Sequence, residues 1–269
     1  MNKKFVCYLD ILGFSKMVEN NTHEDVVELF RKFQFVFLFS FPDSLEKKPN
    51  SDVYFPNYTN IKTKSFFVSD SILIWSEDND VNSFANFTKR IGRILNYAFV
   101  EGYPLRGSIA YGNFTYEKSH KSPVNEGQFI VGNSLVRAVN MEQKTAWSGC
   151  VLDNSCNEIL DMLVFNTERK ETKKLSEHLV EYNIIAQYPV PMKGKDGTEE
   201  INGFAINWVN PMISDKLNLG DFENCFTRYG KSVDSCSVKT KITNTKLFAE
   251  YIVNNQKVIF IGTKSNGEF

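Results

Sequence analysis

The sequence predicts an α+β protein whose first half follows the β-α-β-β-α-β order of a ferredoxin-like sheet. Two observations predict this class. Short apolar runs alternate with longer segments of helical periodicity. The 269 residues are 42% hydrophobic and 14% aromatic, with 23 phenylalanines, which is typical of a densely packed sheet rather than a coiled coil. We expect residues 1–210 to form one core domain and residues 211–269 a mostly helical extension packed on it.

The first half contains most of the predicted sheet. Its expected elements are a strand over 5–9, a helix opening at 23–25, a loop over 41–60, strands over 64–68 and 71–75, and a helix over 81–100. The strands are rich in β-branched and aromatic residues. The first helix carries apolar residues at three-and-four spacing, including Val26, Phe30, Phe33 and Phe37. The loop contains three prolines and several Asn and Asp residues, which favour turns.

The second half adds strands and helices on the same criteria. Its expected elements are strand 105–111, a strand ending at 129–131, helix 134–144, strand 149–152, a helical stretch near 157–164, a polar loop at 169–174, strands 184–190 and 203–208, mostly helix over 212–254, and an apolar run at 258–261. No internal repeat or low-complexity tract is evident. The additional C-terminal strands and helices extend the predicted ferredoxin-like core.

Charge and cysteine content exclude several classes of function. The formal net charge is −1, so no global basic surface attracts nucleic acid or anionic lipid. The five cysteines form no C-x-x-C pair, which argues against a zinc knuckle or a secreted disulfide framework. The longest phenylalanine-rich stretch, 33–41, is too short to span a bilayer. We therefore expect reduced thiols, a cytoplasmic location, and neither a nucleic-acid nor a membrane partner.

Two aspartates stand at the ends of apolar strands, Asp10 after the first and Asp70 between the second and third. If those strands are neighbours, both carboxylates converge near Gly13 and can share hard divalent cations through oxygen ligands. The backbone amides of Gly13, Phe14 and Ser15 would then offer an anion-binding turn beside the cations. Each aspartate alone also fits a purely structural role, because Asp favours turns.

Four segments in order resemble the class III nucleotidyl cyclases. Residues 9–15 resemble that family's first metal motif, and 68–70 its second. Residues 105–112 resemble its next strand, and 132–142 its last signature helix. The resemblance implies the class III cyclase fold and attack of the ribose 3′ hydroxyl of a nucleoside triphosphate on its own α-phosphate.

The resemblance also implies a set of site residues and a partner. Asp10 and Asp70 would bind two divalent cations, Mn²⁺ or Mg²⁺, with the Ile11 carbonyl as a further ligand. Ser69 would lie in the substrate-binding part of the second motif. Active sites of this family form between two head-to-tail protomers, with the metal aspartates from one and the helix residues from the other. A homodimer is therefore implied, with a nucleoside triphosphate as substrate.

Departures from the family concern base recognition and the signature helix. Phe66 and Phe129 occupy the positions where purine-using enzymes carry polar base-reading residues, and a Phe cannot read a purine edge by hydrogen bonds. The helix has Val136 and Asn140 where the family has Asn and Arg, and Arg137 is one residue away. Together with the helix pattern Gly132-x4-Arg137-Ala138-x2-Met141-Glu142 and the late strand 204–208, these departures resemble the bacterial pyrimidine cyclases of Pycsar anti-phage defence. That resemblance implies conversion of UTP, which we favour, or CTP to the cyclic monophosphate, and a separate effector that responds to it.

The roles of two cationic side chains, Lys193 and Arg106, stay open, and so does the choice among several functions. Lys193 resembles the family's late lysine, which can neutralise phosphate charge, and it also fits a solvated hairpin. Arg106, whose neighbouring strand is expected to carry Asp70, fits either a structural ion pair or a phosphate contact. The rivals to a pyrimidine cyclase are a purine cyclase, a catalytically degenerate nucleotide-binding or dimerisation module, and a small-molecule sensor. Retention of both aspartates argues against a module without metal chemistry.

Overall fold

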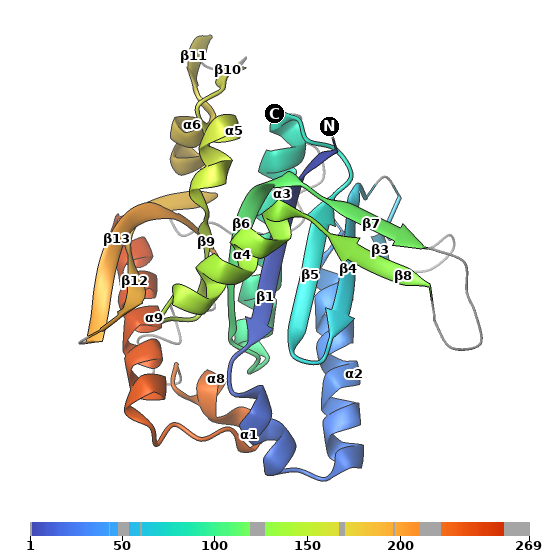
Figure 1. Ribbon diagram of the computed structural model, residues 1–269, viewed down its shortest axis with the longest axis vertical. Coiled ribbons are helices and arrows are strands. Elements are labelled where there is room, and N and C mark those ends of the chain that lie inside the picture. Colours follow the sequence, from blue (N-terminus) through green and yellow to red (C-terminus); the bar gives the residue numbers. More distant parts are fainter. Residues whose placement is uncertain are drawn as a thin grey trace.

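The computed structural model describes residues 2–42, 44–47, 54–59, 61–118, 127–166, 170–195, 197–209 and 222–255. These residues form a mixed α+β structure around a seven-stranded sheet of order β12-β13-β9-β6-β1-β5-β4 (Figure 1). The α+β class predicted from the sequence is confirmed. None of the described helices combines the length and the apolar character needed to cross a membrane.

The strands of the main sheet are β1 (Lys3–Ile11), β4 (Thr63–Val68), β5 (Ser71–Ser76), β6 (Leu105–Asn113), β9 (Gly149–Leu152), β12 (Ile185–Gly194) and β13 (Gly197–Ile206). The helices are α1 (Phe14–Glu19), α2 (His23–Ser40), α3 (Val81–Val100), α4 (Asn133–Lys144), α5 (Asn157–Leu160), α6 (Leu175–Glu181), α8 (Asn224–Thr227) and α9 (Cys236–Asn255), with 3₁₀ turns at Asn154–Cys156 and Arg228–Gly230. Three separate ladders pair β2 (Ser44–Lys47) with β3 (Tyr54–Asn57), β7 (Thr115–Lys118) with β8 (Gln128–Val131), and β10 (Leu163–Asn166) with β11 (Glu171–Lys174).

The centre of the sheet is antiparallel. Strand β1 pairs with β5 on one side and β6 on the other, and β4 pairs with β5, all antiparallel. Strand β9 adds to β6 in parallel, so the chain must cross between them, and it does so through α4. Strands β13 and β12 extend this side of the sheet as an antiparallel hairpin.

The two faces of β1 differ because side chains alternate along a strand. Phe5, Cys7 and Leu9 are fully buried in the main core cluster, together with residues of α2 and α3. Tyr8 and Asp10 point to the opposite face, where α4 lies across β1 and β6 (Figure 1). We call this the α4 face of the sheet; it carries the polar residues discussed below.

Several predicted boundaries are wrong. The loop expected over 41–60 contains β2 and β3, whose four-residue length gives no clear period. The helix expected near 157–164 ends at Leu160, and Val164 lies in β10 because Leu163 begins an extended segment. The polar loop at 169–174 includes β11. The strand that ends at Val131 pairs with β7 in a separate arm and not with the main sheet.

The C-terminal part contributes to the same core as the sheet. The Phe248 ring of α9 packs against Trp147 and Tyr188, with ring centroids 4.8 and 4.9 Å apart respectively. Ala249 and Ile252 of the same helix are fully buried. The helices α8 and α9 agree with the expected helical character of this region, whereas the apolar run at 258–261 lies outside the described residues. The division at residue 210 stays a prediction.

Candidate functional site

Asp10 and Asp70 lie at the same end of two neighbouring strands. The register of β1 and β5 places Asp10 opposite Ser71, and the Ile11 amide donates to the Asp70 carbonyl at 3.1 Å. A tight turn with Ser69 at φ +54° joins β4 to β5 and presents Asp70 beside the end of β1. The Asp10 side chain keeps 22% of its surface exposed. The structure thus brings the two aspartates of the sequence analysis together.

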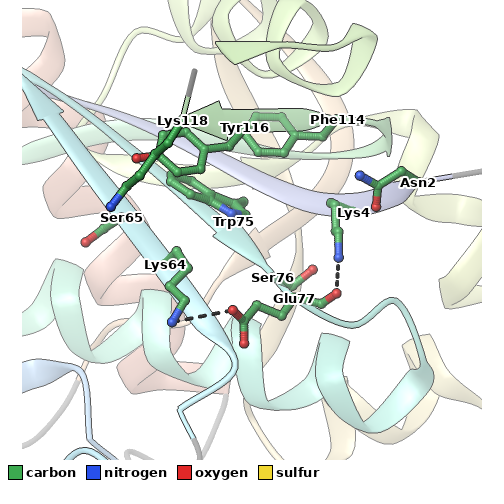
Figure 2. Close-up of a pocket in the computed structure, with 10 residues that line it drawn as sticks. All are labelled: Asn2, Lys4, Lys64, Ser65, Trp75, Ser76, Glu77, Phe114, Tyr116 and Lys118. Carbon is green, nitrogen blue, oxygen red and sulfur yellow. Dashed lines mark hydrogen bonds and ion pairs between the residues drawn. The ribbon is translucent and has the colours of Figure 1, made fainter. Parts of the chain in front are cut away.

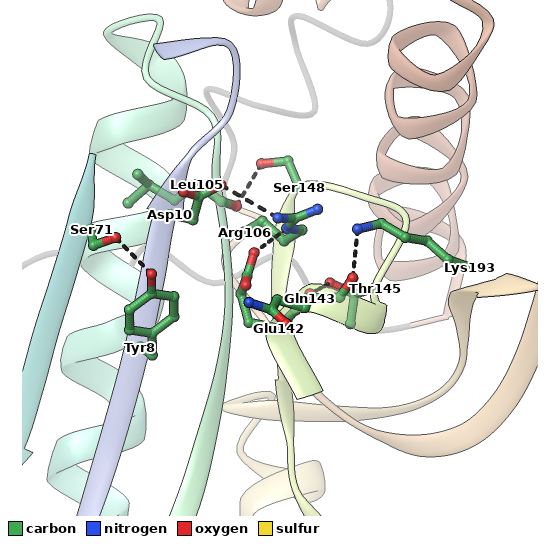
Figure 3. A network of polar contacts seen from close by, with 10 residues as sticks. All are labelled: Tyr8, Asp10, Ser71, Leu105, Arg106, Glu142, Gln143, Thr145, Ser148 and Lys193. Atoms are coloured by element: carbon green, nitrogen blue, oxygen red, sulfur yellow. Dashed lines mark hydrogen bonds and ion pairs between the residues drawn. The ribbon is translucent and has the colours of Figure 1, made fainter. Parts of the chain in front are cut away.

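Arg106 links Asp10 to α4 (Figure 3). Its Nε donates to Glu142 in a buried ion pair, and its Nη2 lies 3.5 Å from Asp10 Oδ2. The expectation that the strand beside Arg106 carries Asp70 is wrong, because β6 pairs with β1 and places Arg106 opposite Asp10. The Tyr8 hydroxyl, on the same face, shares a 2.6 Å hydrogen bond with Ser71. The structure supports an ion-pairing role for Arg106.

The electrostatics of Asp10 are unfavourable for its charged form. Burial is the main cause that raises the pKa of Asp10 to about 7, and the charges of Glu142 and Asp70 raise it further, while Arg106 opposes the shift. Burial also raises the pKa of Glu142, again against the effect of Arg106. The Arg106 guanidinium therefore offsets the charge of two carboxylates, and its closer contact is with Glu142.

This carboxylate arrangement fits a hard divalent cation. The described residues contain no group of three or more His, Cys, Asp or Glu side chains that could hold a metal ion. Asp10 and Asp70 would supply two carboxylate ligands, and a backbone carbonyl, water and substrate phosphates would complete the set, as is common for Mg²⁺. A cation there would offset the repulsion from Glu142 and Asp70 that adds to the effect of burial on the pKa of Asp10. Binding of such a cation by the Ile11 carbonyl stays a prediction.

The Gly13 turn follows directly after β1. Gly13 adopts φ +81° and caps α1, a conformation that favours glycine. A Cβ at this position would lie 2.8 Å from the Lys231 side chain, which passes close by. Ser15 is exposed and Phe14 is half-buried against Phe30 of α2. The turn is therefore held by a segment more than 200 residues later in the chain.

Residues 228–231 form a strap against this turn and against the C-terminal end of α3. Tyr229 donates its hydroxyl to the Glu101 carbonyl at 2.8 Å, and Asn21 donates to the Tyr229 carbonyl at 2.9 Å. The Lys231 ammonium donates to the Gly102 carbonyl. Burial is the main cause that lowers the pKa of Lys231 to about 7. Lys231 was not a predicted site residue, because no local pattern in the sequence connects it to Gly13.

Two more lysines face the polar network from the C-terminal half. Lys193 Nζ donates to the Gln143 carbonyl at 2.5 Å (Figure 3), and burial followed by repulsion from Arg106 lowers its pKa. Lys241 of α9 feels the charges of Arg106, Lys193, Asp10 and Glu142. Lys193 was a predicted site residue, whereas Lys241 and Glu142 were not assigned a role.

Arg137 and Asn140 of the signature helix lie outside the side of α4 that packs on the sheet. Ser134, Ala138 and Glu142 form the buried stripe of α4, while Arg137 and Asn140 are exposed. Helix α4 runs antiparallel to β6, so its early residues lie at the opposite end of the sheet from Arg106. Arg137 instead lines a cavity of about 400 Å³ with residues such as Tyr111 and Glu158.

Of the predicted base-recognising residues, Phe66 lies on the α4 face and Phe129 lies on the separate β7–β8 arm. Phe66 is half-buried against a small cluster that includes Leu73 and Trp75, whereas Phe129 is 45% exposed on the β7–β8 arm. A cavity of about 510 Å³ lies beside this cluster, lined by Lys4, Lys64, Trp75, Tyr116 and others (Figure 2). It is remote from the aspartates, because Trp75 is paired with Val6, four residues before Asp10 on β1.

Comparisons with known proteins found a likeness among the solved structures. No family model matches the chain, and no curated protein matches it. One solved structure that matches is a class III adenylyl cyclase-like ATP-binding protein from Pseudomonas aeruginosa, with 12% sequence identity and a TM-score of 0.41. The match covers 66% of this chain and 40% of that chain. The likeness thus spans well under half the length of that protein.

Proposed function

We propose that the chain is a nucleotidyl cyclase of the class III type, with a ferredoxin-like βαββαβ core. The observation that carries this proposal is the placement of Asp10. Its partly buried carboxylate lies beside Asp70, and Arg106 offsets its charge only in part. The strand order β6-β1-β5-β4 with antiparallel neighbours supports the fold assignment. The four motifs of the sequence analysis lie along this core in the expected order.

The residues of the site have separate tasks in this proposal. Asp10, Asp70 and the Ile11 carbonyl would hold two divalent cations, Mn²⁺ or Mg²⁺. Such cations activate the attacking ribose hydroxyl and stabilise charge on the phosphates. Gly13, Phe14 and Ser15 bind phosphate oxygens through their amides, Ser69 borders the substrate, and Lys193 neutralises phosphate charge. Arg106 holds Asp10 and Glu142 in place.

The complete active site would form in a head-to-tail homodimer. Arg137 and Asn140 are exposed on α4, outside the buried stripe of that helix, so a second copy would supply them to the Asp10 site. Large apolar side chains are exposed on β4, β8 and α4, including Val68 at 58%, Val131 at 59% and Val136 at 59%. Exposed apolar groups of this kind favour a protein partner over solvent.

The substrate would be a pyrimidine nucleoside triphosphate, with UTP favoured over CTP. Phe66 and Phe129 offer no hydrogen bond to a purine edge, and their rings narrow the space for a two-ring base. The product would be the 3′,5′-cyclic monophosphate, with pyrophosphate as the second product. The resemblance to anti-phage cyclases supports a role for this signal in cytoplasmic defence, where a separate effector protein would bind the cyclic nucleotide.

The first alternative is a module that binds a nucleotide without catalysing its conversion, and the sequence of α4 favours it. Arg137 is not where the family has its helix arginine, and Asn140 occupies that position. Such a module would bind a nucleoside triphosphate and leave it unchanged. A purine cyclase is the other alternative.

Incubation with equal amounts of ATP, GTP, CTP and UTP, in the presence of Mn²⁺, separates these functions. Mass spectrometry of the products is expected to show cyclic UMP or cyclic CMP as the main product. Predominant cyclic AMP or cyclic GMP would contradict the pyrimidine assignment and leave the cyclase assignment standing. Bound nucleotide with no cyclic product would contradict the cyclase assignment itself.

A further inference from the structure

The C-terminal helix α9 is fixed to the loop that leads from α4 to β9. Asn244 Nδ2 donates to the Ala146 carbonyl at 2.8 Å, and the Ser148 amide donates to Thr245 Oγ1 at 2.8 Å. Ser148 Oγ in turn donates to the Leu105 carbonyl at 2.8 Å (Figure 3). Leu105 directly precedes Arg106. Two hydrogen bonds therefore anchor one face of α9 beside the strand that carries Arg106.

Lys241 lies on this anchored face of α9. It precedes Asn244 by three residues and Thr245 by four, and residues with these spacings share one face of a helix. The neighbouring Ile242 is 7% exposed and the Thr245 side chain is fully buried, so the contact between helix and loop is tight. The side chain of Lys241 is thus directed toward the region of Arg106, Glu142 and Lys193.

The charges around Lys241 agree with this placement. Burial is the first cause that lowers the pKa of Lys241, repulsion from Arg106 and Lys193 lowers it further, and Asp10 and Glu142 oppose the shift. The cationic side chains of Arg106, Lys193 and Lys241 come from distant parts of the chain. All three therefore lie near the carboxylates of Asp10 and Glu142. Like charges that are held together in a partly buried place favour an anionic ligand.

Lys241 differs from the other two cations in its partners. Arg106 pairs with Glu142 and Asp10, and Lys193 donates to the Gln143 carbonyl. Within the described part of the chain, the Lys241 ammonium has no hydrogen-bond or ion-pair partner. Because this side chain is partly buried, its ammonium has lost part of its hydration, and no described protein group replaces the lost contacts with water.

We propose that Lys241 of α9 is a phosphate-binding residue of the candidate site, with a polyphosphate chain as its ligand. This inference rests on the proposed function, since the polyphosphate is that of the nucleoside triphosphate or of the pyrophosphate that leaves. The Lys241 ammonium contacts non-bridging phosphate oxygens and offsets the charge that grows on the leaving group. It also gives the C-terminal extension a task in substrate binding.

The test measures the binding of inorganic tripolyphosphate to the full-length protein by calorimetry in the presence of Mg²⁺. A hydrogen bond to a charged group contributes about 1.5–3 kcal/mol, so Lys241→Ala is expected to weaken binding by about 10- to 100-fold. Lys241→Arg should retain most of the affinity, because it keeps the charge. Lys246→Ala, at an exposed position on the same helix, should bind like the wild type.

Kinetics provide the second readout, and the outcomes separate the two proposals. The KM for UTP should rise in Lys241→Ala by a similar factor, with a smaller fall in kcat and an unchanged melting temperature. If Lys241→Ala destabilises the fold, Lys241→Gln is measured in its place. Equal tripolyphosphate affinity in wild type and variant overturns the role of Lys241 while cyclisation by the wild type still stands. A wild type that binds neither tripolyphosphate nor any nucleoside triphosphate overturns both proposals.

Discussion

Replacement of Asp10 by Asn is expected to stabilise the metal-free protein while it removes one of the proposed metal ligands. Asn has nearly the shape of Asp and lacks its charge. In the absence of a cation, the charged Asp10 is disfavoured by burial and by Glu142 and Asp70, which together raise its pKa to about 7. Ionisation of Asp10 therefore lowers the free energy of unfolding. The variant avoids this loss.

The size of the effect follows from the two pKa values. The pKa of Asp10 is about 7 in the fold against 3.8 in the unfolded chain. The difference of about three units sets an upper limit of ~4 kcal/mol, at about 1.4 kcal/mol per unit. The variant also loses the charge contact with Arg106 Nη2 at 3.5 Å. We expect a net gain of about 2 kcal/mol, or about 4–8 °C in melting temperature.

The sign of the pH dependence is opposite to that of an ordinary salt-bridged aspartate. Between about pH 4 and 7 the folded protein retains a proton that the unfolded chain has lost, so wild-type stability falls as the pH rises. Above about pH 7 the loss is complete. The advantage of Asp10→Asn should therefore be full at about pH 8.5 and less than half as large at about pH 5.

Thermal unfolding in EDTA at these two pH values tests this reasoning. Asp161→Asn is a suitable control, because the Asp161 side chain is 62% exposed and its ion pair with Lys174 lies at the surface, where such pairs contribute little. A lower melting temperature for Asp10→Asn at pH 8.5, or an equal gain at both pH values, would refute the account. Added Mn²⁺ should raise the melting temperature of the wild type more than that of the variant.

Three further predictions concern the assembly and the strap. Light scattering at micromolar concentration should show a homodimer, and a fully active monomer would contradict the composite site. Gly13→Ala should lower stability by about 1–2 kcal/mol in urea unfolding, because φ is +81° and Lys231 lies close by; unchanged stability would contradict the turn geometry. Burial lowers the pKa of Lys231 to about 7, so wild-type stability falls as the pH drops from about 10 to 7. Lys231→Met should therefore gain more at about pH 6.5 than at pH 9, and the reverse order would be contrary evidence.

Local sequence patterns were sufficient for the long elements of the fold. The helix over 81–100 was predicted with the observed bounds of α3, because Asp80 caps it and its apolar residues face the core. The strands next to Asp10 and Asp70 also lie where their β-branched and aromatic residues predict them. The four-residue strands of the β2–β3 and β10–β11 hairpins were missed, since segments of this length have no recognisable period and are formed by their cross-strand pairing.

The candidate site could be predicted only in part, for a related reason. Asp10 and Asp70 were found because each stands at the end of a strand and the two strands are neighbours. The partner of Arg106 was misjudged, because strand order depends on which side of β1 receives β6. Lys241 and Lys231 reach the site through the packing of the C-terminal region. No spacing along the chain connects either lysine to Asp10 or Gly13.

Product analysis with wild type and Asp70→Asn, each supplied separately with UTP and CTP in the presence of Mn²⁺, tests the central claim most directly. The wild type is expected to form cyclic nucleotide and pyrophosphate in equal amounts, because the ribose hydroxyl displaces pyrophosphate in a single step. Asp70→Asn should form neither and should keep the wild-type melting temperature in EDTA within a few degrees. Linear monophosphate in place of the cyclic product, or wild-type turnover by Asp70→Asn, would contradict the assignment.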